Sequence, residues 1–184
     1  MSKTFQEATE RAESAGEGGP RWIPVAAAAL AVLAAVSGYL ANVRATQALI
    51  AKNDSIVATT RASDTYNEYQ AERVKYAVVE TALEAGTSPS RDVAKLKATA
   101  AREAAKAPPL IKIAQSFERT ADELDVKSEH LMDQHETIEV GSTLFEVSIV
   151  LVSITALVGS RLLPVAAGLA AALGAAAFIY GMLR

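Results

Sequence analysis

Three runs of about 20 predominantly apolar residues constrain this 184-residue chain more than any other feature. They cover residues 23–41, 140–158 and 162–183, and as α-helices each would be roughly 30 Å long, which matches the hydrocarbon thickness of a bilayer. A soluble core helix of that length normally shows a charged outer face, whereas Glu146 is the only charged residue in the three runs. The sequence therefore predicts an all-α membrane protein with three transmembrane helices.

A polar segment precedes the first of these runs. Residues 1–22 are rich in Glu, Ser and Gly and hold too few apolar residues to form a core, so we expect a flexible tail. The run at 23–41 is longer than the roughly 7 to 15 apolar residues of a secretory signal. This length favours a retained membrane anchor.

Residues 42–139, between the first and second runs, are the predicted water-soluble part. They hold 13 of the 18 basic and 16 of the 21 acidic side chains, and their apolar residues recur at helical spacing. One helix is expected to continue out of the membrane to a C-terminal cap at Gly86. Its sevenfold apolar repeats are Val43, Ile50 and Val57; Leu49 and Ile56; and, after a change of register near Ser63, Tyr69, Tyr76 and Leu83.

A second long helix is predicted to lead into the second apolar run. Residues 87–92 indicate a turn, and Pro108 with Pro109 indicates a break before this helix begins. Its apolar positions alternate steps of four and three, which keeps one seam facing a partner: Leu110, Ala114, Phe117, Ala121, Leu124, Ser128, Leu131, His135 and Ile138. The spacing fits an antiparallel helical hairpin within the chain and equally an intermolecular coiled coil.

The segments "RWIPVAAAALAVLAAVSGYLAN" (21–42) and "IAKNDSIVATTRASDTYNEYQAERVK" (50–75), with the closing pair of apolar runs, carry a family resemblance. The chain resembles the bacterial domain of unknown function 4337 family from about Arg21 to the C-terminus, most specifically around Asp64 and Tyr69. In that family an aromatic residue, typically Trp, follows the Asp, and this chain has Tyr66. The resemblance implies an integral protein of the bacterial inner membrane with no assigned activity.

Catalytic and cofactor motifs are missing from the sequence. The chain has no cysteine, which excludes thiol chemistry and disulfides, and it shows neither a phosphate-binding glycine loop after a strand nor a serine nucleophile elbow. A net charge of −3 without a basic stripe argues against nucleic acid as a partner. We therefore expect a protein that is not an enzyme and needs no cofactor.

An acidic cluster lies directly before the second apolar run and contains both histidines. Glu129, His130, Asp133 and Glu136 are the candidates for binding a divalent cation, but the spacings of di-iron and zinc motifs are missing. A solvated acidic face, balanced by nearby basic residues, is the favoured interpretation. His135 falls on the apolar seam, where a polar residue usually fixes register or partner number.

Glu146 allows three interpretations. Counted from residue 140 it lies one to two turns into the apolar run, where its carboxylate could reach the headgroups. It could instead bond another helix, with Ser37, Tyr39, Ser142 and Thr143 as neighbours. Alternatively it could be a functional acid facing water in an oligomeric pore.

The apolar runs favour a multi-pass membrane protein, and the family resemblance implies the bacterial inner membrane. We expect the helical domain to be periplasmic. We expect its partners to be lipid and either further copies of itself or other membrane proteins. The favoured function is that of a self-associating or scaffolding membrane-anchored coiled coil. The alternative is an ion channel or transporter subunit that uses Glu146 and the acidic cluster.

Overall fold

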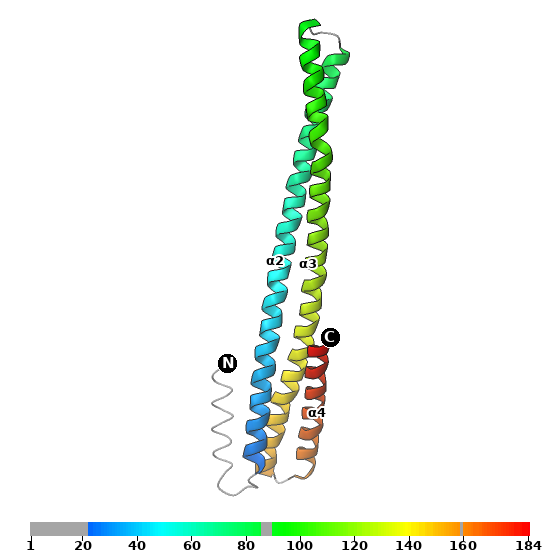
Figure 1. Cartoon of the computed structure of the whole chain (residues 1–184). Helices are drawn as coiled ribbons and strands as arrows, with labels where there is room; N and C mark the ends of the chain where they lie inside the picture. Colours follow the sequence, from blue (N-terminus) through cyan, green and yellow to red (C-terminus); the bar gives the residue numbers. More distant parts are fainter. Residues whose placement is uncertain (1–21, 86–89, 159) are drawn as a thin grey trace. The chain divides into compact units, whose positions relative to one another are not determined.

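The computed structural model describes residues 22–85, 90–158 and 160–184 (Figure 1). These residues form three α-helices and no strand: α2 (Trp22–Glu84), α3 (Ser90–Val158) and α4 (Leu162–Leu183). Each helix contains a stretch that is long and apolar enough to cross a membrane. The predicted all-helical class with three long apolar helices is confirmed. The tail predicted at 1–22 lies outside the described residues except for Trp22, which begins α2.

The helices contribute to two compact units. The terminal unit consists of the described residues up to Leu49 together with Glu129–Arg184, and the central unit is Ile50–Ser128. In the terminal unit, α2, α3 and α4 share a buried apolar cluster formed by Ile23, Ala27, Val152 and Ala167. Only 11% to 33% of the most apolar window of each helix is buried, so most of the apolar surface of these helices points outward.

The central unit pairs α2 with α3 through small side chains. The buried small residues of α2 are Ala51, Ser55, Ala58 and Ala62, and those of α3 include Ala107, Ala114, Ala121 and Ser128. Each set follows helical steps of three, four or seven residues, so each helix presents one narrow face of small residues. Small side chains let helix backbones approach closely, and the Ser55 hydroxyl reaches across to donate to the Ala121 carbonyl at 2.9 Å.

The large apolar residues of the predicted α2 stripe are not the residues that pack. Ile50 is 55% exposed and Val57 is 49% exposed, and Leu49 and Ile56 are exposed as well. Tyr69, Tyr76 and Leu83 are half-buried, and they continue the four and three steps of the buried line from Ala62. The predicted change of register near Ser63 is therefore wrong. The apolar repeat changes register because its residues before Ser63 lie on the outer face of α2, whereas its later residues lie on the packed face. The packed face itself continues without a change of register.

The predicted turn at 87–92 and the predicted break at the two prolines differ from the structure. Ser90 begins α3, so Ser90, Arg91 and Asp92 are helical rather than part of a turn. The rest of that turn, at 87–89, and the predicted cap Gly86 lie outside the described residues. Pro108 and Pro109 lie inside α3 without ending it. Both prolines and the residues four positions earlier, Ala104 and Ala105, are exposed, so water can bond the carbonyls that lose their helical donors.

Candidate functional site

Close glycine contacts join α4 to α3 in the terminal unit. A Cβ atom placed on Gly174 would lie 3.0 Å from the carbonyl oxygen of Gly141 and 3.3 Å from Cδ1 of Phe145. One placed on Gly181 would lie 2.8 Å from Cγ1 of Ile138. These contacts fix the register of α4: its midpoint, close to Gly174, lies beside residues 141–145 of α3. Figure 1 shows α4 beside the C-terminal part of α3.

Two polar contacts fix the register of α2 against α3 in the same unit. The Ser142 hydroxyl donates to the Ala34 carbonyl at 3.1 Å, and Nδ1 of His135 donates to the Ala41 carbonyl at 2.9 Å. His135, predicted on the seam, is half-buried, and Leu131 and Ile138 on that seam are buried. The end of the apolar run at Ala41 is therefore level with His135, and Ala34 is level with Ser142.

The contacts with α2 and α4 place Glu146 closer to the middle of the apolar helices than counting from residue 140 suggests. It is four residues beyond Ser142, which is about 6 Å along the axis. Because α2 and α4 both run antiparallel to this part of α3, Glu146 is within about one turn, roughly 5 Å, of the midpoints of the α4 helix and of the 23–41 run. The register of the two neighbouring helices thus places the acid deep within the apolar part of the unit.

The polar residues expected near Glu146 bond elsewhere. Ser142 bonds Ala34, and the Thr143 hydroxyl donates to the Glu139 carbonyl at 3.0 Å. Ser37 is buried and Tyr39 is 66% exposed. Glu146 itself is exposed, and within the described ranges it makes neither a hydrogen bond nor an ion pair.

Three residues of the acidic cluster before the second apolar run have polar partners within the protein. Asp133 forms an ion pair with Arg184 at 3.0 Å, and Nε2 of His130 lies 3.2 Å from the side-chain nitrogen of Gln134. Nε2 of His135 lies 3.4 Å from Glu139. In the part of the chain that the structure describes, no three His, Asp or Glu side chains are grouped to hold a metal ion, so Glu129, His130, Asp133 and Glu136 are not brought together.

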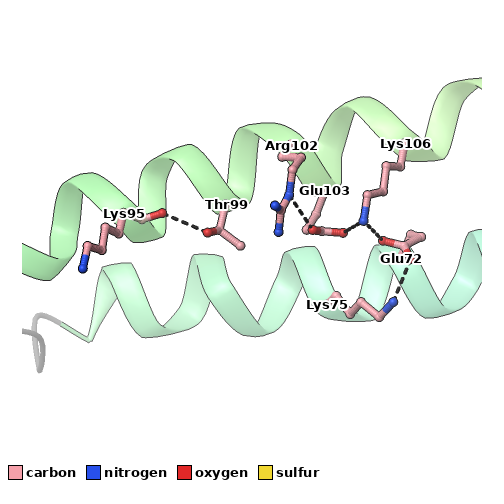
Figure 2. Close-up of polar contacts among 7 residues, drawn as sticks. All are labelled: Glu72, Lys75, Lys95, Thr99, Arg102, Glu103 and Lys106. Atoms are coloured by element: carbon pink, nitrogen blue, oxygen red, sulfur yellow. Dashed lines mark hydrogen bonds and ion pairs between the residues drawn. The ribbon is translucent and has the colours of Figure 1, made fainter.

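A buried polar cluster that the sequence analysis missed occupies the central unit (Figure 2). Glu72 of α2 is only 7% exposed and Glu103 of α3 only 5%. Lys106 lies 2.7 Å from Glu103 and 3.5 Å from Glu72, so one ammonium group bridges the carboxylates of both helices. Lys75 at 2.7 Å from Glu72 and Arg102 at 3.3 Å from Glu103 complete the cluster.

The cluster favours the ionised form of Glu103. A hydrogen bond with the Glu72 side chain, followed by the bond from Lys106, lowers the pKa of Glu103 to about 2. The bond to Glu103 in turn raises the pKa of Lys106 above its ordinary value. The seam supplied a signal for this cluster, because four and three steps taken backwards from Leu110 reach Ala107 and then Glu103. Because a break was predicted at Pro108 and Pro109, the seam was not followed to residues before Leu110.

Two exposed polar contacts also join α2 and α3 in the central unit. Lys52 forms an ion pair with Asp125. The Tyr66 hydroxyl donates to Glu118 at 2.8 Å, and this bond raises the pKa of Tyr66 above its ordinary value. Tyr66, the aromatic residue two positions after Asp64, thus supplies a phenol donor toward α3.

The fold defines an all-helical protein with three apolar helices of membrane-spanning length. The model of the family described as Domain of unknown function (DUF4337) matches residues 20–184, so the chain belongs to this family. This match confirms the resemblance drawn from the sequence. Comparison with curated proteins and with solved structures found no match.

Proposed function

We propose that this protein is a membrane-anchored helical scaffold, without enzymatic activity, that associates with further copies of itself. The three apolar helices cross the bacterial inner membrane and hold the central unit outside it. Arg21, two residues before the first apolar residue of the run at 23–41, favours placing that end in the cytoplasm and the central unit in the periplasm. Support for the anchoring comes from the length of the helices and from their outward apolar surface.

The observation that carries the proposal is an outer apolar stripe on α2 in the central unit. Ile50, Asn53, Val57 and Thr60 are exposed and follow steps of three, four and three, and the exposed Ile56 lies beside them. This spacing keeps the residues on one face of the helix, opposite the face that packs on α3. A solvated helix rarely maintains such a repeat on its outer face, so the stripe indicates a partner helix.

Asn53 favours a second copy of the chain as that partner. Two copies anchored in one membrane present their α2 helices in the same direction, so equivalent residues can meet across a twofold axis. Asparagine supplies both a donor and an acceptor, and a single Asn between apolar residues such as Ile50 and Val57 can pair with its own counterpart and set the register. No acidic or basic residue lies among the five stripe residues to repel its copy.

Native mass spectrometry of the full chain in detergent tests this proposal. We expect the wild-type chain to be at least a dimer, and Val57→Lys to shift it toward the monomer because two ammonium groups would meet at the interface. Thr59→Lys is the matched control, since it adds the same charge two residues away at an exposed position outside the stripe. A monomeric wild-type chain, or equal masses for both variants, would refute self-association through this stripe.

A further inference from the structure

Glu146 belongs to a face of α3 that neither neighbouring helix covers. In the terminal unit, α2 bonds α3 at His135 and Ser142, and α4 contacts it at residues 137–145. Thr143, Glu146 and Val150 follow steps of three and four on the remaining side, and all three are exposed. We call these three residues the α3 outer face.

The depth of this face matters once the apolar helices are placed in a membrane, so the inference rests on the membrane anchoring proposed above. Glu146 lies within about one turn of the midpoints of both α4 and the 23–41 run, and it would therefore lie near the middle of the hydrocarbon. Ionisable residues at that depth usually face protein or water and pair with another group. The described residues of this chain leave Glu146 without such a group.

Charge complementarity identifies the kind of partner. The apolar runs at 23–41, 140–158 and 162–183 contain no Lys, Arg or His. A second copy docked through the same face would bring another Glu146 to the same depth, and like charges there oppose association. Because no copy of this chain carries a cation in its apolar runs, a cation that pairs with Glu146 at this depth would come from a different protein.

We propose that the α3 outer face binds a transmembrane helix of another protein that carries a Lys or Arg at mid-membrane depth. Val150, with the adjacent exposed Val147 and Ile154, supplies apolar surface for packing along that helix. The Thr143 hydroxyl donates its hydrogen to the Glu139 carbonyl of the same helix, so it has no donor left for the partner helix. Glu146 is therefore the polar group of this face that selects the partner. The scaffold thus recruits a protein inside the membrane in addition to associating through its central unit.

Energy transfer in vesicles tests this recognition directly. The full chain is reconstituted in phosphatidylcholine vesicles, and Trp22, its single tryptophan, serves as donor. The acceptor is a dansyl group on a synthetic Leu and Ala transmembrane peptide that has one central Lys, compared with the same peptide that has Leu there. We expect the Lys peptide to bind roughly 3- to 18-fold more tightly than the Leu peptide, the range expected for one polar contact between membrane helices.

Two variants make the outcome specific. Glu146→Leu should abolish the preference for the Lys peptide, and it should fold because the residue is exposed, which circular dichroism checks. Glu136→Gln, which removes an exposed acid outside the apolar run, should preserve the preference. Equal binding of the two peptides by the wild-type chain, or a preference that survives in Glu146→Leu, would overturn the proposal. So would a homo-oligomer whose mass falls in Glu146→Leu, because the occupant would then be a second copy.

Flotation of the vesicles after an alkaline carbonate wash separates this proposal from the anchoring on which it rests. A chain that is washed off would overturn both proposals. A chain that floats with the vesicles but ignores the central Lys would overturn only the recruitment through Glu146. Neither result depends on the Val57 test of self-association.

Discussion

Replacing Gly174 by alanine should weaken the packing of α4 on α3. The new methyl group would lie 3.0 Å from the Gly141 carbonyl oxygen and 3.1 Å from Cβ of Leu144. Both are close to the backbone and cannot swing away, so the helices must separate by a few tenths of an ångström. Gly168, on the same helix, has open space within 4 Å of its Cβ position and provides the matched control.

The magnitude follows from two opposing effects. Overpacking a close contact costs about 1–3 kcal/mol. Alanine improves on glycine in a helix interior by about 1 kcal/mol. Both variants share this gain in helix propensity, so it cancels in the comparison. We expect Gly174→Ala to be less stable than Gly168→Ala by about 1–3 kcal/mol.

Titration of the micelle-embedded chain with sodium dodecyl sulfate, followed by far-ultraviolet circular dichroism, measures this difference. Gly168→Ala should unfold at or above the wild-type midpoint, and Gly174→Ala below that of Gly168→Ala. If the two variants had equal midpoints, α4 would not contact α3 through Gly174. The depth assigned to Glu146 from α4 would then lose its basis.

Two further predictions concern the central unit. The pKa of Glu103 in the folded chain, about 2, lies below the ordinary value of 4.5. The contribution of ionised Glu103 to stability is therefore complete above about pH 4.5 and is lost as the pH falls toward 2. Thermal unfolding followed by circular dichroism should show that Glu103→Gln loses less stability over that pH interval than the wild-type chain does. The buried Ala58 belongs to the packed face, so Ala58→Leu should lower the free energy of unfolding by about 1–3 kcal/mol. Val74→Leu, at an exposed position of the same helix outside the outer stripe, should change it by less than about 0.5 kcal/mol, and equal effects in denaturant titrations would contradict the assigned packed face.

Sequence patterns predicted the helical class because long apolar runs and four and three steps follow directly from helix geometry. The α3 seam is one example: Ala114, Ala121 and Ile138 are buried, while Leu110, Phe117 and Leu124 are half-buried. Hydrophobicity alone predicted the wrong packed face for α2, because Ile50 and Val57 are more hydrophobic than the buried Ala51 and Ala58. The helices pack through the smaller residues, because close backbone approach favours small side chains over large apolar ones.

Other features depended on contacts that one segment cannot reveal. The depth of Glu146 is set by the register of α2 and α4, which follows from Ser142, Gly141 and Gly174 rather than from the start of its own apolar run. The Glu72 and Glu103 cluster requires two helices to be paired correctly. Pro108 and Pro109 are tolerated because they face outward, a property decided by the packing of Ala107.

Disulfide cross-linking at position 53 tests the central claim of self-association most directly. The chain has no cysteine, so Asn53→Cys introduces a unique thiol on the outer α2 stripe, and Asp54→Cys introduces one at an exposed position beside it. In vesicles under mild oxidation, we expect Asn53→Cys to form a covalent dimer rapidly and Asp54→Cys to do so much more slowly. Equal rates for the two variants, or a failure of Asn53→Cys to cross-link, would contradict association of two copies through this stripe.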